Sequence, residues 1–535
     1  MTAAVTPAAT YPYRRSPDQD RRQAAHHPVI IIGAGPVGLS LALDLARRGR
    51  RSVVLDRRTA LSDGSRAICW SKRTLEIMDR LGVADDLVAH GVTWQRGKVF
   101  HRNAAVFEFD LLPESGHKRP AFINLQQFHF EQACLAAVER TGLVDVRWGH
   151  DVAALDAAPD AARLAVATPD GRYDLSCDWL VAADGARSTV RGALDLGFVG
   201  QTFDDQFLIT DIRMTTERPT ERWFWFDPPF NPGQSALLHR QAGNVWRLDF
   251  QIGRDADRAE EMKPENVARR VRAMLGDIDF AFEWISCYRF HCRRLEHFRH
   301  GRVLFAGDAA HQVSPFGARG GNSGIQDADN LGWKLALVLD GRAPDVLLDS
   351  YDSERRQAAD ENILNSTRAT DFISPKGPGA TALRDAVLDL AASEPFARRF
   401  LNSGRLSLPT TYDGSPLNGC DGLGPEVARA LRPGAPAVDA PVLNGWLLDE
   451  LGRGFTVLTV DATKADGGVV RTSTVIDGIT VEIVTANGPE IAERYGADQG
   501  VVHYLMRPDQ HVAARWRGDI DDHLRPALRT ALGLS

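Results

Sequence analysis

Residues 29–56 read VIIIGAGPVGLSLALDLARRGRRSVVLD, and the rest of the fold can be inferred outward from them. The first four residues are all β-branched, which is typical of a short buried strand. The loop GAGPVG follows at once, in the G-x-G-x-x-G spacing, and opens a helix with apolar residues one turn apart. A second apolar strand, residues 52–55, ends at Asp56. Together these features predict a nucleotide-binding βαβ unit at the start of a doubly wound α/β sheet.

Each glycine of the loop has its own predicted role. Gly33 permits a tight turn, Gly35 lets the backbone approach a pyrophosphate, and Gly38 lets the helix pack against the strand. The free N–H groups and the dipole of the helix that opens at Pro36 favour a phosphate at its start. Asp56 lies about 20 residues further on, where a carboxylate can accept hydrogen bonds from a ribose. The alternative is a glycine-rich turn in an ordinary α/β domain.

The composition is that of an ordinary globular protein, with 44% apolar and 25% charged residues. A chain of 535 residues is too long for one simple core, so we expect roughly two to four domains. A net charge of −7 is small for this length and gives no electrostatic footprint for nucleic acid or an anionic membrane. No apolar run approaches the length of a membrane span. We therefore expect neither a nucleic-acid partner nor a membrane partner.

The six cysteines include no C-x-x-C pair. This pattern predicts a reducing compartment, by default the cytoplasm, and favours neither a zinc site nor a redox disulfide. We expect no bound metal. Residues 1–27 contain Pro, Arg, Asp and Gln but no apolar core like that of a signal peptide, so we expect a disordered tail.

The character of the chain changes between residues 199 and 300, where short, alternating, aromatic-rich runs predict an antiparallel sheet. This sheet interrupts the nucleotide-binding domain, which we place at residues 28–198 and 301–375. Gly, Pro and Ser cluster beyond that domain, and we interpret residues 376–414 as a connecting segment. Residues 415–535 carry further strand and helix signals and are predicted to form a separate small α/β domain.

Three short apolar strands end in glycine or aspartate, at Gly33, at Asp184 and at Gly307, which Asp308 follows. Ligands of a doubly wound sheet bind at the carboxyl ends of its strands. If these three strands are neighbours, their turns line one extended ligand. The alternative is that Asp184 and Asp308 are only turn formers or helix caps.

Residues 307–335 continue the third turn as GDAAHQVSPFGARGGNSGIQDADNLGWKL. Gly317, Gly320 and Gly321 form a flexible turn just before a predicted helix, and such a turn points backbone N–H groups at whatever lies in front of the helix. A phosphate suits this position, and so does the pyrimidine edge of an isoalloxazine, where reduction places negative charge. Pro315 stiffens the approach to the turn.

Three of these motifs resemble the single-component, class A flavoprotein aromatic hydroxylases of the para-hydroxybenzoate hydroxylase type. They are GAGPVG, DGARSTVR at residues 184–191, and GDAAH with PFGARGGN at residues 307–322. The C-terminal part, with LNGWLLDELG at residues 443–452 and VVHYLMRPDQHVA at residues 501–513, resembles the thioredoxin-like third domain of phenol hydroxylase relatives, closest to the 3-(3-hydroxyphenyl)propionate hydroxylase subgroup. The resemblance implies an FAD-binding domain, an inserted substrate-binding sheet and a thioredoxin-like domain, which here lacks a C-x-x-C.

For the adenosine half of FAD, the resemblance implies contacts at three places in the chain. The glycine loop, Pro36 included, would hold the pyrophosphate, and Asp56 would hold the adenosine ribose. Arg57 would lie over the adenosine half, and Arg66, in the stretch GSRA, would reach the pyrophosphate.

For the flavin half, the resemblance places Gln127 at the ribityl region and Asp308 on the ribityl hydroxyls. Asp184 and Arg191 would support both FAD and a passing nicotinamide cofactor. The other FAD contacts implied are Gly307, Pro315, Gly320, Gly321 and Asn322, of which the last three face the pyrimidine ring.

The reaction implied by the resemblance is hydroxylation of a phenolic ring. NADPH or NADH, a choice that the sequence leaves open, reduces FAD; O2 then adds at flavin C4a, and the distal oxygen of the hydroperoxide attacks the ring. The protein supplies position, dryness and electrostatics. The implied partners are a small aromatic substrate and O2, and a homodimer is left open. A larger polyketide or antibiotic substrate fits the same motifs.

Candidate substrate residues come from the inserted sheet and from Pro315. His239 could help to ionise the substrate phenol as a base, although a lone histidine on a strand is more often packed or at the surface. Arg247 alternates with apolar residues and could hold a carboxylate bidentately, against the alternative of a surface arginine. Trp225 is the candidate aromatic wall, although core packing explains it equally well. Alternation along residues 222–226 lets only the tryptophans or only the phenylalanines face the substrate.

Three other functions remain open at this point. A plain NAD(P)-dependent dehydrogenase needs only residues 33–56 and leaves the later motifs without a role. A flavin reductase or disulfide oxidoreductase usually needs a second dinucleotide fold or paired cysteines, and neither is visible in the sequence. A protein that binds FAD without turnover would show no oxygen-dependent NAD(P)H consumption stimulated by a phenol.

Overall fold

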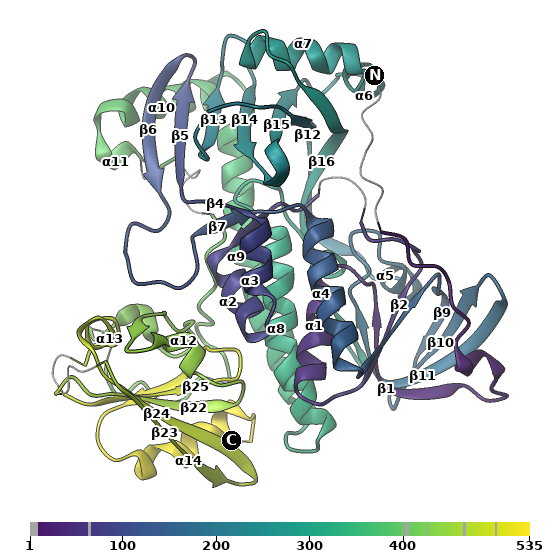
Figure 1. Ribbon diagram of the computed structural model, residues 1–535, viewed down its shortest axis with the longest axis vertical. Coiled ribbons are helices and arrows are strands. Elements are labelled where there is room, and N and C mark those ends of the chain that lie inside the picture. Colours follow the sequence, from purple (N-terminus) through teal and green to yellow (C-terminus); the bar gives the residue numbers. More distant parts are fainter. Residues whose placement is uncertain are drawn as a thin grey trace.

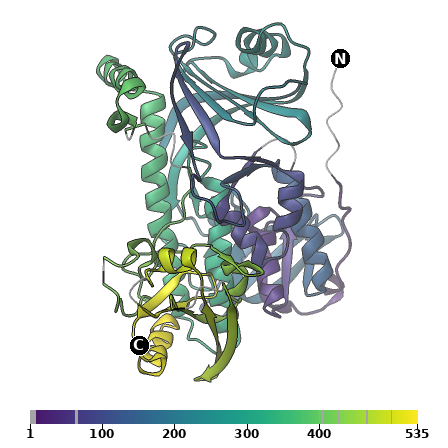
Figure 2. The same cartoon turned by 60° about the vertical axis from the view of Figure 1, so that its left-hand side comes forward.

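The computed structural model describes residues 9–62, 66–398, 400–401, 406–424, 426–463, 467–497 and 500–534. Figure 1 shows three bodies: a parallel sheet covered by helices, a large antiparallel sheet above it, and a C-terminal domain at its side. Two long helices, α8 (Gly320–Leu339) and α9 (Leu347–Ile373), pass between them, and α9 reaches from the parallel-sheet body to the antiparallel sheet (Figures 1 and 2). The predicted α/β fold class is confirmed.

The parallel sheet begins at the β-branched run of the sequence, whose residues are buried in β1. Its central strands follow the order β18-β11-β1-β2-β8 and are all parallel. Their bounds are β18 (Val303–Phe305), β11 (Gly171–Ala182), β1 (Ala25–Ile32), β2 (Ser52–Asp56) and β8 (Val144–Trp148). Three antiparallel strands complete the sheet: β17 (Arg299–His300), β9 (Asp151–Ala157) and β10 (Ala162–Thr168). The predicted βαβ unit is confirmed, since α1 (Pro36–Arg47) joins β1 to β2.

Helix α1 lies between α8 and α4 (Gln127–Thr141), and its contact with α8 depends on two glycines. A Cβ at Gly324 would lie 2.6 Å from Val37 Cγ2 and 3.3 Å from the Cα of Gly307. A Cβ at Gly332 would overlap the carboxylate of Asp44. The two helices therefore approach more closely than side chains would allow, and this approach holds the turn at Gly307 against α1.

Short elements connect the parallel sheet to the rest of the molecule. A small antiparallel sheet has the order β3-β7-β4, and two helices, α2 and α3, follow β3. The bounds of these connecting elements are β3 (Cys69–Ser71), α2 (Lys72–Arg80), α3 (Ala84–His90), β4 (Val92–Trp94), β7 (Phe122–Asn124), α5 (Thr189–Ala193) and the 3-10 helices η2 (Ala242–Asn244) and η3 (Gly307–Ala309).

The second sheet has the order β19-β16-β12-β15-β14-β13-β5-β6 and is antiparallel except between β13 and β5. The bounds are β19 (His311–Gln312), β16 (Ala281–Leu295), β12 (Phe198–Arg213), β15 (Val245–Ile252), β14 (Ser235–Arg240), β13 (Arg222–Phe226), β5 (Arg96–His101) and β6 (Ala104–Asp110). Its outer face packs against α7 (Pro264–Leu275), next to the short α6 (Arg258–Glu261). Its inner face is turned toward the parallel-sheet body (Figure 2).

Two segments differ from the expected domain boundaries. Strands β5 and β6 belong to the second sheet, although residues 28–198 were assigned to the nucleotide-binding domain. Residues 376–414 are more than a connecting segment, because α10 (Pro378–Ser393) and α11 (Pro395–Arg398) pack on that sheet through Leu388 and Ala391. Both differences arise from contacts between distant parts of the chain, which local sequence patterns do not report.

The C-terminal domain is a mixed sheet with the order β23-β24-β22-β25-β26, in which β22 and β24 are parallel. Its bounds are β22 (Phe455–Val460), β23 (Val469–Ile476), β24 (Ile479–Ala486), β25 (Val502–Met506) and β26 (Val512–Trp516), with α12 (Leu447–Glu450), α13 (Pro489–Tyr495), α14 (Ile520–Ala531), η5 (Arg429–Leu431), β20 (Pro441–Val442) and β21 (Gly445–Trp446). All six cysteines lie in the described part of the chain, and none is in a disulfide. The assignment of the C-terminal domain as thioredoxin-like stays a prediction.

The tail expected at residues 1–27 is ordered over much of its length. Residues 1–8 lie outside the described residues, but η1 (Pro17–Asp20) and the first part of β1 fall within the segment. Tyr11 stacks on Trp148, with ring centroids 4.9 Å apart. Asp18 is buried and accepts hydrogen bonds from Arg147 at 2.6 Å and from His27 at 2.8 Å. The prediction of disorder is wrong here because two of these partners, Trp148 and Arg147, lie in β8, far along the chain.

We expect Gly324→Ala to destabilise the α1–α8 contact, because the added methyl group meets Val37 and overpacking costs about 1–3 kcal/mol. The thermal midpoint should fall by about 1 °C for each kcal/mol lost in a chain of this length, measured by calorimetry. The matched control is Gly379→Ala in α10, where a Cβ meets no atom within 4 Å. An equal midpoint for the two variants would show that the close approach is not required.

Candidate functional site

The carboxyl ends of β1, β11 and β18 lie side by side, as expected for three turns that share one ligand. The amide that follows β11 donates to the carbonyl of Ile32 at 2.8 Å. The amide of Ala306 donates to the last carbonyl of β11 at 3.0 Å. The turns at Gly33, Asp184 and Gly307 therefore open at one edge of the sheet, and their predicted adjacency is confirmed.

The glycine loop leaves room in front of α1. Gly33 has a φ of +108°, and a Cβ there would overlap the carbonyl of Ala183. A Cβ at Gly38 would overlap the carbonyl of Gly33, so protein atoms fill the space at both positions. At Gly35, by contrast, a Cβ would meet no heavy atom within 4 Å, and α1 begins directly after it with Pro36 as its first residue. An open position before a helix N-terminus fits the pyrophosphate of FAD.

Asp56, at the end of β2, ties the glycine loop to the following turn. Its Oδ2 accepts hydrogen bonds from the amide of Ala34 and from Arg58 Nη2, both at 2.8 Å. Its Oδ1 accepts from the amide of Arg58 at 2.8 Å. Arg57 is exposed. A ribose at Asp56 would therefore share its oxygens with Arg58, a residue that sequence reasoning passed over in favour of Arg57.

Gln127, at the start of α4, holds the segment that follows Arg66. Its Oε1 accepts from the amide of Ala67 at 3.3 Å, and its Nε2 donates to Glu131 Oε1 at 2.8 Å. Glu131 also accepts from the amide of Ser62 at 2.7 Å. The exposed Arg66 is thus carried by a segment that α4 fixes at two points.

Asp184 and Arg191 connect the second and third turns. Asp184 Oδ2 caps α5, accepting from the amides of Thr189 at 2.7 Å and Val190 at 3.2 Å, whereas its Oδ1 is buried without a partner among the described residues. Arg191 donates to the carbonyl of Ala309 at 3.2 Å. Burial lowers the pKa of its guanidinium. Both the cap and the free oxygen lie at the edge where the three turns meet.

The third turn, at Gly307, is held in place by α8, while the side chain that follows it faces solvent. Gly307 has a φ of +62°, and its amide donates to Asp327 Oδ2 at 2.8 Å. The next residue, Asp308, has an exposed side chain. Surrounding protein nevertheless raises the pKa of this carboxyl, while His311 and Arg66 act in the opposite direction. The carboxyl is therefore accessible to a ligand although much of the surrounding space is protein.

Helix α8 begins against β3. Asn322 Oδ1 accepts from the amide of Ser71 at 2.8 Å, and its Nδ2 donates to the carbonyl of Cys69 at 2.9 Å. A Cβ at Gly321 would lie 3.3 Å from the ring of Trp70, whereas one at Gly320 would meet only Val313, at 3.6 Å. The side chain of Asn322 is thus occupied, and only backbone groups of this turn remain for a ligand. Pro315, before the turn, is exposed.

A row of polar side chains crosses the inner face of the second sheet and meets the same segment, residues 66–71. Strand pairing places Arg222, His239, Arg247, Asp211 and Trp284 in this polar row, one from each of five adjacent strands. His239 Nδ1 lies 3.9 Å from Cys69 Sγ, and Arg247 Nη1 donates to the carbonyl of Arg66 at 3.2 Å. Residues 66–71 therefore have the predicted FAD residues on one side and the predicted substrate residues on the other.

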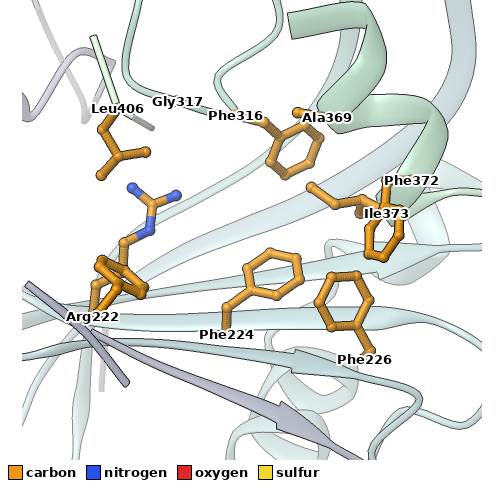
Figure 3. Close-up of a pocket in the computed structure, with 10 residues that line it drawn as sticks. Arg222, Phe224, Phe226, Phe316, Gly317, Ala369, Phe372, Ile373 and Leu406 are labelled. Carbon is orange, nitrogen blue, oxygen red and sulfur yellow. The ribbon is translucent and has the colours of Figure 1, made fainter. Parts of the chain in front are cut away.

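An apolar cavity adjoins the polar row at β13. Figure 3 shows Phe224, Phe226, Phe316 and Phe372 gathered around it, while the guanidinium of Arg222 projects toward Leu406. Trp225 does not line this cavity, because it alternates to the outer face and packs on Phe100 with ring centroids 5.0 Å apart. The choice of Trp225 as the aromatic wall is wrong for this cavity, and the phenylalanines of β13 take that place.

The two other predicted substrate residues, His239 and Arg247, are buried in the polar row. Arg247 already makes a bidentate pair, with Asp211, at 2.9 and 3.3 Å, so its fork is not available to a substrate carboxylate. Burial, together with Arg222 and Arg247, lowers the pKa of His239 well below its ordinary value. The imidazole is thus neutral at physiological pH and accepts a proton poorly.

Sequence reasoning missed Arg222 and Asp249. Arg222 makes no hydrogen bond or ion pair with any described residue, and burial lowers the pKa of its guanidinium. Asp249 lies two residues beyond Arg247 on the same face. The alternation of RWFWF was the available signal for Arg222, since it shares a face with Phe224.

Several buried polar atoms on this inner face have no partner among the described residues. They include His239 Nε2, Asp249 Oδ1, Trp284 Nε1 and Ser286 Oγ. A buried polar atom without a partner costs about 1–3 kcal/mol. Their concentration on one face indicates a surface that receives a polar ligand or water.

The described residues contain neither a cluster of metal-ligating side chains nor a helix that could span a membrane. They contain no group of three or more His, Cys, Asp or Glu side chains that could hold a metal ion. Within the same part of the chain, each helix is either too short or too polar to cross a bilayer.

Comparison with known proteins agrees with this geometry. The family model described as "FAD binding domain" matches residues 26–366. The 3-(3-hydroxy-phenyl)propionate/3-hydroxycinnamic acid hydroxylase of Mycolicibacterium smegmatis is 30% identical, over 80% of this chain and 76% of its own. The 12-dehydrotetracycline 5-monooxygenase/anhydrotetracycline 6-monooxygenase of Streptomyces rimosus is also 30% identical, over 95% and 99%. The crystal structure of aklavinone-11 hydroxylase with FAD and aklavinone is 25% identical, with a TM-score of 0.76 over 96% of this chain and 100% of its own.

We expect Asp308→Ala to weaken FAD binding about 10- to 100-fold, the loss of one hydrogen bond to a charged group. Titration of the stripped protein with FAD, followed by flavin fluorescence, measures the change. Asp255→Ala, which removes an exposed carboxylate from the loop after β15, is the control. Equal FAD affinity in both variants would remove Asp308 from the proposed cofactor contacts.

Proposed function

The chain belongs to the family of the class A flavoprotein aromatic hydroxylases, and on this basis we propose that it hydroxylates a phenolic ring with NAD(P)H and O2. The observation that carries the proposal is the position of residues 66–71. On one side of this segment lie the three turns and the start of α8, and on the other lies the polar row of the second sheet. Residues 66–71 thus separate the edge of the parallel sheet where we propose that the nucleotide binds from the inner face of the second sheet, which carries buried polar atoms without described partners.

FAD, when bound, supplies electron transfer from NAD(P)H and delivery of one oxygen atom from O2 to the ring. The protein must hold this cofactor by its phosphates and by its polar edges. The residues that we propose for this are Gly33, Gly35, Pro36, Gly38, Asp56, Arg57, Arg66, Gln127, Asp184, Arg191, Gly307, Asp308, Pro315, Gly320, Gly321 and Asn322. The open Cβ position at Gly35 and the free oxygen of Asp184 support this set.

The second sheet would hold the substrate. The phenylalanines of the cavity exclude water and stack against an aromatic ring. Arg222 is the only charged residue among those that line the cavity within the described chain, and its unpaired guanidinium suits an anionic group on the substrate. His239 stays neutral and offers Nε2 as a hydrogen-bond partner.

A larger polycyclic substrate is a second candidate. It is favoured by the Streptomyces rimosus relative, which matches this chain over almost its whole length, whereas the Mycolicibacterium hydroxylase matches over four fifths of it. The two candidates share the cofactor chemistry and differ in the size of the ring system that the second sheet receives.

A panel of phenols and polycyclic phenols tests the proposal. We expect the purified protein to retain FAD and to oxidise NADPH or NADH faster when its substrate is added. Mass spectrometry should then show a product that has gained one oxygen atom. Stimulated oxidation that yields only hydrogen peroxide with every compound would contradict hydroxylation.

We expect Arg222→Gln to raise the KM for 3-(3-hydroxyphenyl)propionate about 10- to 100-fold, because one charge-assisted contact to the carboxylate is lost. The KM for 3-ethylphenol, which lacks the carboxylate, should change little. Arg289→Gln, an exposed arginine of β16, serves as the control. If Arg222→Gln changes both KM values equally, Arg222 does not read the anionic group.

A further inference from the structure

Asp249, on β15, is an acidic side chain of the inner face that makes no hydrogen bond or ion pair with any described residue. Its Oδ1 is buried without a partner, while the residue as a whole keeps partial access to solvent. It pairs across the sheet with Leu237 on β14 and Ile209 on β12, one row beyond the polar row. Both neighbours are aliphatic, so neither satisfies the carboxyl.

Charged and titratable groups surround Asp249 at longer range. They are Arg222 on β13, His239 on β14, Arg247 on β15, Asp211 on β12 and Cys69 on β3. Burial raises the pKa of Asp249 to about 6, and Asp211 adds to this, while Arg247 and Arg222 oppose it. The carboxyl is therefore mostly ionised at pH 7.5 and mostly protonated at pH 5.

The alternative base on this face is His239, and its surroundings disfavour that role. Two guanidiniums, those of Arg222 and Arg247, oppose a positive charge on the imidazole. Protonation of Asp249 instead removes a buried negative charge that has no partner. The surroundings therefore favour protonation of the Asp249 carboxyl and disfavour protonation of the His239 imidazole.

We propose that Asp249 is a catalytic residue that accepts the proton of the substrate phenol, an inference that rests on the proposed function. In this step the phenol O–H bond breaks, the proton moves to a carboxylate oxygen of Asp249, and the electron pair stays on the phenol oxygen. No electron leaves or enters the protein. The resulting phenolate is more nucleophilic at its ring carbons.

A binding experiment tests the contact without turnover. The probes are 3-(3-hydroxyphenyl)propionate and its methyl ether, 3-(3-methoxyphenyl)propionate, titrated into the FAD-loaded protein and followed by flavin absorbance. Wild type should prefer the phenol about tenfold at pH 7.5, and this preference should fade as pH falls through 6, because the carboxylate acceptor is lost. Asp249→Asn, whose amide oxygen still accepts a hydrogen bond but carries no charge, should show a smaller preference that does not change with pH. A wild type that does not distinguish the probes, or an Asp249→Asn variant whose preference keeps the pH dependence of wild type, overturns the proposal.

The pH profile of hydroxylation tests the proton transfer. The kcat/KM of wild type should rise with pH through an apparent pKa near 6, and His239→Gln should keep this limb. Asp249→Asn should lose the limb and about a hundredfold in product formation. Asp204→Asn, an exposed acid of β12, is the matched control. An acid limb that persists in Asp249→Asn overturns the proposal.

A stability measurement separates this role from a structural one. The pKa of Asp249 is about 6 in the folded protein against an ordinary 3.8, so its ionisation costs stability progressively as the pH rises from 3.8 to about 6, and the full cost remains at pH 7.5. Asp249→Asn should therefore leave the thermal midpoint at pH 7.5 unchanged or raised, and a lower midpoint would indicate a structural role. If wild type distinguishes the probes yet forms no oxygenated product, the hydroxylase proposal fails while the contact with Asp249 stands.

Discussion

Asp327 on α8 is fully buried, and three groups share its carboxylate. The amide of Gly307 donates at 2.8 Å, His311 Nε2 lies at 2.7 Å, and Arg355 Nε donates at 2.6 Å. Burial raises the pKa of this carboxyl, but His311 and Arg355 lower it further, so the group stays charged. A buried charge that lost one of these partners would cost about 3–5 kcal/mol. The third turn of the site therefore keeps one position relative to α8.

This ion pair continues into the C-terminal domain. Arg355 Nη1 donates to the hydroxyl of Tyr412 at 2.8 Å, and the neighbouring Glu354 accepts from Arg507 at 2.6 Å. Arg507 in turn pairs with Asp509 at 2.6 Å, and all of these side chains are buried. The domain is thus joined to α9 by paired charges. Through these pairs the domain contributes to the frame that holds α9.

The sequence predicted what depends on local patterns. The βαβ unit, the three strand ends and the antiparallel sheet follow from β-branched runs, glycine spacing and alternation. It did not predict that β5 and β6 join the second sheet, because that pairing is long-range. Within the site, alternation limited the choice to two faces of β13 but did not select the phenylalanines, since the sequence does not state which face meets α9. The sequence likewise did not indicate that Asp211 pairs with Arg247.

The two sides of the site differ in how their charges are satisfied. Around Asp327 the described ions are paired, and pairing fixes geometry. On the inner face of the second sheet, Asp249 Oδ1 is buried without a partner among the described residues, and Arg222 pairs with none of them, although leaving buried polar groups unsatisfied costs stability. Proteins keep such destabilising, unsatisfied groups at sites where a bound ligand completes the missing contacts. In the proposed function, the frame around Asp327 would set the position of the cofactor, whereas side chains of β12 to β16 would set the choice of substrate. Fixed, paired charges suit the first task, and polar groups left open for a ligand suit the second.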